Sequence, residues 1–316
     1  MASCLRWAVG AVIFWCVSCP LASAQRTPAA EATRVQSRDG VELSVSFYPS
    51  RVAQDPALGK QVTPVVLLHD EKDTQGSFSS LVARLQQAGQ GQNQPTFAIV
   101  TVDLRGHGAS TRQTAPNGQI RELDAAKLSR NDIQAMTIYD MEAVRSMLVE
   151  KNDAGQLNLN KLCLVGVGLG ATVAVNWAAQ DWSAPPLLVG KQGQDVKALV
   201  LVSPQWKYRG IMMQQALKLA AMKKGAAWML IFGEESSNQT ADAHRMMKQL
   251  ERFHPEPAAN STVPRGLVEL PVKSSLEGSG LLSQMGQPIE ERIVEFLKTN
   301  VASQELPWSK RRNRLQ

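Results

Sequence analysis

The sequence predicts an α/β protein in which a mainly parallel sheet carries helices on both faces. Three observations predict this class. Short apolar runs alternate with amphipathic segments along most of the chain, as in strands joined by helices. The run at 62–69, VTPVVLLH, is almost entirely apolar, which is typical of a strand buried on both faces. At 161–179 an apolar run meets a glycine-rich turn and then an alanine-rich segment, which indicates a strand, a turn and a helix.

Residues 1–24 have the pattern of a secretory signal peptide. Arg6 precedes an apolar stretch at 7–17, and a small-residue cleavage site ends at Ala24. We therefore expect an exported protein, periplasmic or extracellular, with a disordered leader over 25–32. No other segment is long and apolar enough to be transmembrane.

Three of the four cysteines, Cys4, Cys16 and Cys19, lie in the predicted signal peptide. A lipid anchor at Cys16 or Cys19 stays open as an alternative. Cys163 lies in an apolar run and is expected to be a small buried hydrophobe. A single cysteine cannot form an internal disulfide, so the fold must be held by its core.

The formal charge of +6 is concentrated near the C-terminus. The folded body is close to neutral, which argues against a nucleic-acid-binding face. We expect a basic tail over 301–316 that is solvated and disordered and makes at most a weak contact with an anionic surface. The charges of this tail are Lys310, Arg311, Arg312 and Arg314.

The first half of the chain predicts a β-hairpin, two strands and two helices. Residues 34–48 alternate between apolar and polar around the turn dipeptide Asp39-Gly40. Asn131-Asp132 is a capping signal for a long amphipathic helix. Between them we expect a strand at 62–69, a helix at 77–90 and a strand at 96–102.

The second half continues the alternation after the unit at 161–179. Nothing in it repeats internally or leaves room for a second domain, so residues 33–300 form a single domain. The expected elements are strands at 196–202, 227–232 and 266–270 and helices at 212–223, 240–253 and 288–299.

The turn after the apolar run at 161–167 contains Gly166, Gly168 and Gly170 at alternate positions. Two kinds of site use such a turn. In a Gly-X-Ser-X-Gly elbow, small flanking residues let strand and helix approach closely. In a dinucleotide-binding turn, bare backbone cradles a pyrophosphate, and Gly166, Gly168 and Ala171 satisfy that pattern formally.

The segment Asp103-Leu104-Arg105-Gly106-His107-Gly108-Ala109-Ser110 decides between these readings. It resembles the D-x-R-G-H-G-x-S loop of the α/β-hydrolase superfamily, in particular its lysophospholipase-like and serine-aminopeptidase-like branch, and the resemblance covers about 33–300. It implies an α/β-hydrolase fold with a minimal lid or none, in which His107 shapes the loop. The dinucleotide reading weakens, because several strands precede the turn and the next strand ends without a carboxylate.

The resemblance gives each member of a catalytic triad an expected position. The nucleophile position is Gly168, which has no side chain. The acid position is Ser236, with Glu234 and Glu235 nearby, and the histidine position is Glu277. No histidine follows His254 in the sequence.

The oxyanion region implied by the resemblance involves His69, Asp70 and Leu169. Asp70 replaces the usual glycine, and its carboxylate would oppose a developing negative charge. Restoring a serine at Gly168 alone is therefore not expected to restore activity.

Three other groups of residues have the composition of a possible site. Asp103, His107 and Ser110 have the residue types of a triad, but on one short loop they are expected to bond to the backbone. His69 with Asp70, Glu71 and Asp73 lacks an ordered metal-ligand spacing, so no metal site is predicted. Three of the seven tryptophans, Trp177, Trp182 and Trp206, are expected to pack around the helix after the turn and to fill the core, with a ligand-stacking pocket as the alternative.

The sequence thus predicts an exported, catalytically inactive protein of this fold, without a cofactor, whose vestigial crevice binds an unidentified small molecule or protein. The alternative is a working esterase, lipase or peptidase that acts on an ester or amide through atypical residues. A third class is a structural envelope protein held by its basic tail.

Overall fold

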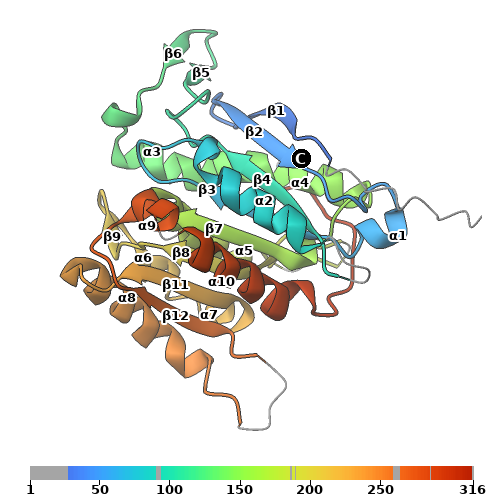
Figure 1. The fold of residues 1–316 in the computed structure, drawn as a ribbon. Coiled ribbons are helices and arrows are strands. Elements are labelled where there is room, and N and C mark those ends of the chain that lie inside the picture. Colours follow the sequence, from blue (N-terminus) through green and yellow to red (C-terminus); the bar gives the residue numbers. More distant parts are fainter. Residues whose placement is uncertain are drawn as a thin grey trace, which may run out of the picture.

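The central sheet has eight strands in the computed structural model, which describes residues 28–89, 94–185, 187–188, 190–258, 264–284 and 286–314. Counted across the sheet, the first three strands pair antiparallel with their neighbours, and from the third strand onward neighbouring strands are parallel (Figure 1). Their order across the sheet is β1 (Glu31–Gln36), β2 (Glu42–Tyr48), β4 (Phe97–Val102), β3 (Thr63–Leu68), β7 (Leu162–Val167), β8 (Val196–Val202), β11 (Ala227–Gly233) and β12 (Leu267–Val272).

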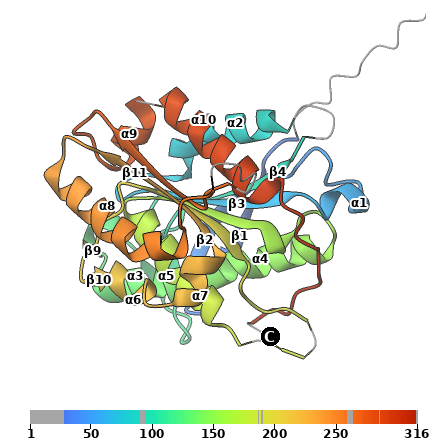
Figure 2. The same cartoon turned by 90° about the horizontal axis from the view of Figure 1, so that it is seen from below.

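Helices cover both faces of the sheet, which Figure 2 shows edge-on. One face packs against α2 (Ser79–Ala88), α9 (Gly278–Gln284) and α10 (Gly286–Leu297). The other packs against α3 (Arg130–Ala135), α4 (Met141–Asp153), α5 (Leu169–Ser183), α6 (Met213–Ala216), α7 (Ala220–Gly225) and α8 (Ser237–Leu250). Helix α1 (Pro56–Gly59) is a single turn between β2 and β3.

Alternate residues of each central strand enter these two apolar layers. In β3, Val65 and Leu67 face the layer of α2 and α10, whereas Val66 and Leu68 face the layer of α4 and α5. A strand buried on both faces has no polar side, which explains the continuous apolar runs of the sequence. The predicted mainly parallel sheet with an N-terminal antiparallel hairpin is confirmed.

Several short elements differ from the predictions. The polar segment before α3 forms a projecting two-stranded arm, β5 (Arg112–Thr114) and β6 (Ile120–Glu122) (Figure 1). The predicted helix at 212–223 is instead two short helices, α6 and α7. They follow a small hairpin whose strands have two residues each, β9 (Lys207–Tyr208) and β10 (Ile211–Met212). The two short strands and the two short helices are the only regular elements between Ser203 and β11 in the described residues. Helix α9, which precedes α10, was not predicted.

Two boundaries also differ. Strand β1 begins at Glu31, inside the expected disordered leader. The helix expected at Asn131-Asp132 begins one turn earlier, because Ser129 is the N-cap and forms a capping box with Asp132. The predicted signal peptide, with Cys16 and Cys19, lies outside the described residues.

The segment after α10 is not the solvated tail that the sequence predicted. Residues 303–314, here called the C-terminal strap, run along the amino-terminal edge of the sheet. Asn158 Nδ2 donates to the carbonyl of Leu306 at 2.8 Å, and Asn152 Nδ2 donates to that of Ser309 at 3.1 Å. The strap is therefore part of the folded domain, although Lys310 and Arg312 remain exposed.

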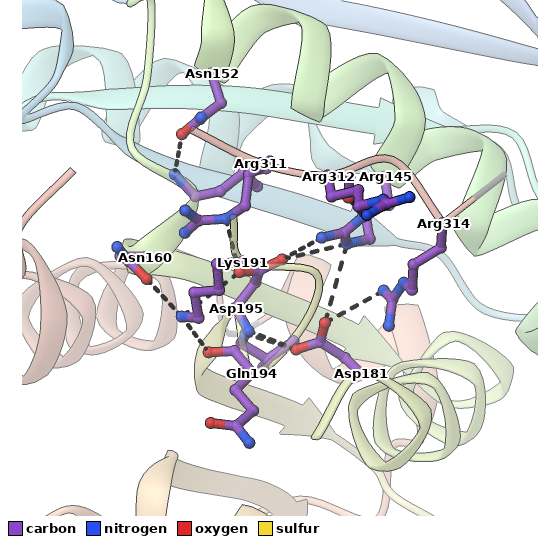
Figure 3. A network of polar contacts seen from close by, with 12 residues as sticks. Arg145, Asn152, Asn160, Asp181, Lys191, Gln194, Asp195, Arg311, Arg312 and Arg314 are labelled. Atoms are coloured by element: carbon purple, nitrogen blue, oxygen red, sulfur yellow. Dashed lines mark hydrogen bonds and ion pairs between the residues drawn. The ribbon is translucent and has the colours of Figure 1, made fainter. Parts of the chain in front are cut away.

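Two arginines of the strap reach buried carboxylates (Figure 3). Arg311 Nε donates to Asp195 at 3.0 Å, and Arg145 of α4 binds the other oxygen of the same carboxylate at 2.8 Å. Arg314 pairs with Asp181 at 3.3 Å. Burial acts to raise the pKa of Asp195, but the positive charges of Arg311 and Arg145 hold this pKa below its usual value. The prediction of a solvated tail was wrong because the acidic partners, Asp195 and Asp181, lie far from the strap in sequence.

Cys163 is fully buried in β7, as expected. Burial raises the pKa of its thiol, which keeps the sulfur protonated and unreactive. Within the described ranges, none of the helices has the length and apolar character that a membrane span requires.

Candidate functional site

The turn between β7 and α5 lies at the carboxyl-terminal edge of the sheet. Gly168 has φ +49° and ψ −107°, a conformation that side chains strongly disfavour. Its N–H donates to the carbonyl of Val202 in β8 at 3.0 Å. Strand and helix approach closely here, since a side chain at Gly170 would overlap the carbonyl of Leu68. The geometry is that of a strand-turn-helix elbow with no side chain at its tip.

The Asp70 carboxylate fills the space above that tip. Its Oδ1 accepts hydrogen bonds from the backbone N–H of Glu71 at 2.7 Å and of Leu169 at 2.9 Å. A side-chain carbon built on Gly168 would overlap this carboxylate. Leu169 is the first residue of α5, so Asp70 supplies an internal anion to the positive end of the helix.

Burial raises the pKa of Asp70, and the N–H donors of Leu169 and Glu71 oppose this shift. The neighbouring carboxylates of Asp73 and Glu71 add to the rise. Asp70 remains partly exposed, and its surface faces the pocket described below.

His69 lies behind Asp70 and is fully buried. Its Nδ1 donates to the carbonyl of Asp70 at 2.6 Å, and its Nε2 accepts from the N–H of Leu104 at 2.9 Å. Burial lowers the pKa of His69 to about 4, so the imidazole is neutral at pH 7. His69 thus holds the loop of Asp70 and does not line the pocket.

The other two predicted triad positions meet beside the same turn. Ser236, which follows β11, donates its hydroxyl to Glu277 at 3.1 Å, and Glu277 directly precedes α9. Glu277 lines the pocket together with Gly168 and Asp70. The fold therefore brings the three positions together, and none of them carries the side chain that its assigned place in a Ser-His-Asp triad requires.

The pocket above Gly168 has a volume of about 370 Å³. It is formed by the segments that follow β3, β7 and β8, by the first turns of α8, and by the start of α9. Its wall is mostly polar and consists of Asp70, Gly168, Ser203, Pro204, Gln205, Asn238, Gln239, Ala241, Asp242, Arg245, Glu277 and Gly278.

Sequence reasoning missed Ser203, which ends up in this wall. It follows β8, is 4% exposed, and has φ +48°, an uncommon value for a residue with a side chain. Its Oγ accepts a hydrogen bond from the N–H of Gly278 at 2.9 Å. The sequence shows only that Ser203 ends a strand, and a positive φ at serine has no sequence signal.

Asp242 and Arg245 were missed as well, although both lie within the helix predicted at 240–253. Asp242 accepts from the backbone N–H of Trp206 at 2.9 Å and lies 3.6 Å from Arg245. One helical turn apart, both side chains project from α8 toward the wall of the pocket. The sequence does not show which face of this helix turns toward the pocket.

The loop at 103–110 supports the fold around the site. Asp103 accepts from the N–H of Gln75 at 2.8 Å and of Ala109 at 3.0 Å. His107 Nδ1 donates to the carbonyl of Arg105 at 2.9 Å, and Ser110 Oγ accepts from a backbone N–H of β2. These side chains bond mainly to the backbone and not to one another.

Arg105 ties the same loop to two distant parts of the chain. Its guanidinium binds Asp140 at 2.6 and 2.9 Å and Asp39, in the hairpin turn, at 2.7 and 2.8 Å. Gly106 and Gly108 of this loop both have positive φ. The loop thus fixes the hairpin against the helices beside the elbow.

The remaining sequence candidates lie elsewhere or are engaged. Glu71 pairs with Arg209 and accepts from Tyr208, and Asp73 accepts from Ser279. Among the described residues no group of His, Cys, Asp and Glu is arranged to hold a metal ion. Of the three tryptophans, Trp177 is buried in the core, Trp182 and Trp206 pack against it, and none lines the pocket.

Comparisons with known proteins agree with this geometry. A model of the alpha/beta hydrolase family matches residues 65–289. No curated protein sequence matches the chain. Among solved structures, the Pyrococcus furiosus esterase Pf2001 is similar with a TM-score of 0.58 and 12% identity, over 86% of this chain and 91% of that one.

Two further structures are similar over 87% of this chain at 13% identity, each with a TM-score of 0.54. They are the α/β hydrolase GrgF from a Penicillium species, covered over 100% of its length, and dipeptidyl peptidase 4 from Porphyromonas gingivalis, covered over 36%. At such identities these likenesses show the fold alone. The family model covers most of the chain and includes the elbow, so this protein belongs to the α/β hydrolase family.

Proposed function

We propose that this family member does not catalyse acyl transfer and that the pocket above Gly168 binds a small molecule. One observation carries the proposal: the Asp70 carboxylate occupies the two backbone donors beside the turn and the space in which a nucleophile would lie. Acyl transfer requires those donors to be free for the developing oxyanion.

The distribution of histidines supports the same proposal. The chain contains four, and none lines the pocket. His69 and His107 are buried in the loops beside it, His244 pairs with Glu269 on the outside of α8, and His254 bonds to the carbonyl of Lys223. No imidazole is therefore placed to accept a proton from a nucleophile in the pocket.

Labelling with a fluorophosphonate probe tests the proposal. We expect no labelled serine in the native protein and none in Gly168→Ser, because the new side chain meets Asp70 and lacks a base. Gly168→Ser combined with Asp70→Gly opens the space and still lacks the base, so it should also stay unlabelled. A labelled serine in the native protein, mapped by mass spectrometry, overturns the proposal.

The second candidate is a hydrolase of an ester or amide that uses atypical residues, and Ser203 is the observation that favours it. A strained φ at a buried residue of a pocket wall is a feature of functional sites. In that case the fluorophosphonate labels Ser203, and Ser203→Ala abolishes the labelling. Ser236→Ala is the matched control, since Ser236 borders the pocket through Glu277.

Export remains a proposal that rests on residues 1–24 alone. It is supported by the apolar stretch and the small-residue site that ends at Ala24. Fractionation of cells that produce the full chain, with N-terminal sequencing of the mature form, tests it. A mature protein that begins at Gln25 supports export, and an intact N-terminus inside the cell contradicts it.

A further inference from the structure

The charges in the wall of the pocket are unbalanced. Three carboxylates line it, from Asp70, Asp242 and Glu277, against one guanidinium, from Arg245. The Arg245 guanidinium lies 3.6 Å from the Asp242 carboxylate, so these two opposite charges largely offset each other. The apolar part of the wall is small, so apolar burial contributes little to ligand binding in this pocket.

The other two carboxylates have no counter-charge in the structure. Within the described part of the chain, no ion pair includes Asp70 or Glu277. Glu277 accepts a hydrogen bond from the neutral hydroxyl of Ser236. Both hydrogen bonds to the Asp70 carboxylate come from backbone N–H groups and end on Oδ1. Asp70 Oδ2 therefore keeps its capacity to accept hydrogen bonds, and it lies between the backbone of Gly168 and that of Gly278, two residues that line the pocket.

The same arrangement disfavours an anionic ligand. The N–H groups of Leu169 and Glu71 would be the natural donors to a carboxylate or phosphate at the end of α5. Both are already bonded to Asp70, so an anion would have to displace a like charge from them. A cation is attracted to the same carboxylate, and it can bind Oδ2 without breaking the hydrogen bonds from Leu169 and Glu71 to Oδ1.

We propose that the pocket binds a small organic cation, a primary ammonium whose N–H groups donate to Asp70 Oδ2 and whose charge is balanced further by Glu277. This inference rests on the proposed function and names the class of its ligand. A charge-assisted hydrogen bond in a partly desolvated pocket is stronger than a neutral one. A volume of about 370 Å³ is near the lower end for small-molecule sites, which suits a ligand of a few heavy atoms.

The test compares three probes of similar size at low ionic strength: n-butylammonium, n-butanol and butyrate. Binding is followed by chemical-shift changes in the protein and by titration calorimetry. We expect n-butylammonium to bind and the other two to bind at least tenfold more weakly. Equal or tighter binding of butyrate overturns the inference, as does no detectable binding of n-butylammonium.

Asp70→Asn is the decisive variant, since it keeps the shape and the Oδ1 acceptor and removes the charge. We expect it to weaken n-butylammonium binding at least tenfold, and Glu277→Gln to weaken it less. Glu122→Gln, on the exposed arm, is the matched control and should bind as the native protein does. Urea unfolding confirms that each variant is folded, and unchanged binding by folded Asp70→Asn overturns the inference.

The two proposals fail separately. A serine labelled by the fluorophosphonate overturns the noncatalytic function, whatever the amine does. A lack of n-butylammonium binding in a protein that stays unlabelled overturns the cation inference alone.

Discussion

At the scale of single residues, Asp70 and Gly168 are a matched pair. Gly168 adopts a φ that disfavours any side chain, and the carboxylate of Asp70 occupies the position in which that side chain would lie. Each residue explains the other. Asp70 at this position requires glycine in the turn, and glycine in the turn leaves the space that Asp70 fills.

Gly168→Ala should therefore destabilise the protein by more than backbone strain alone. A residue with a side chain in this sparsely populated φ/ψ region costs about 1–3 kcal/mol, and overlap with Asp70 adds about 1–3 kcal/mol. In an Asp70→Ala background the overlap disappears, so the same change should cost only the strain. A double-mutant cycle by urea unfolding measures the coupling.

Asp73→Ala provides the control background for that cycle, because it removes a nearby carboxylate and leaves Asp70 in place. There Gly168→Ala should cost as much as in the native protein. Additive effects of Gly168→Ala and Asp70→Ala would show that the two residues do not share the space.

The buried His69 gives the protein a characteristic dependence on pH. Burial lowers its pKa in the folded state to about 4, against 6.5 for an unperturbed histidine. Between these values the unfolded chain binds a proton that the folded protein does not, so stability falls as the pH falls through this window. From pH 7 to pH 5 the loss from this group is about 2 kcal/mol.

His69→Gln should flatten the pH dependence of the unfolding free energy between pH 7 and pH 5. His244→Gln, at an exposed histidine on α8, is the control and should leave the slope as in the native protein. Equal slopes for the native protein and His69→Gln would contradict a buried neutral imidazole at this position.

The family resemblance, and not a derivation from spacing, assigned the triad positions to Gly168, Ser236 and Glu277. These residues lie close together in the structure because parallel strands bring their carboxyl ends to one edge of the sheet. The sequence also marked Asp70 as unfavourable to an oxyanion. The bonds from Leu169 and Glu71 to its carboxylate could not be predicted, because they depend on a side-chain rotamer and on the distance between two loops.

At the scale of elements, the C-terminal strap is held by a buried ion-pair network (Figure 3). The side chain of Arg311 is fully buried and lies 3.0 Å from Asp195. Arg311→Ala should cost about 3 kcal/mol, the lower end for breaking a buried pair, because Arg145 still partners Asp195. The free energy of unfolding in urea measures this cost.

Arg312→Ala is the matched control for the strap. Arg312 neighbours Arg311 and carries the same charge, but its side chain is exposed. Its loss should change stability by less than about 0.5 kcal/mol. Equal effects of the two changes would mean that Arg311 contributes only its charge, as expected for a solvated tail.

The elements that were predicted well are those whose own sequence pattern determines their secondary structure. Strand β11 is an almost continuous apolar run, as is most of β3 and of β8, and such buried runs mark the extent of the strand. The arm of β5 and β6 and the hairpin of β9 and β10 have strands of three residues or fewer, and such strands exist only because a partner lies beside them. The strap was misread because charge alone predicts solvation, and its acidic partners lie far away in sequence.

At the scale of the whole molecule, the acidic pocket and the exposed basic side chains of the strap lie at opposite ends of the parallel strands. The carboxyl-terminal edge holds the acidic pocket, with Asp70, Asp242 and Glu277. The amino-terminal edge holds the strap, where Lys310 and Arg312 add exposed positive charge to the buried arginines.

The strap is synthesised after the strands and helices on which it packs. Asp195 precedes β8 and is made well before Arg311, so a growing chain that already contains the central strands still lacks one of the two arginines that neutralise this carboxylate. Domains begin to fold from their N-terminal parts as they emerge. We therefore expect the ion pairs of Asp195 and Asp181 with the strap to form only after residues 311–314 have emerged.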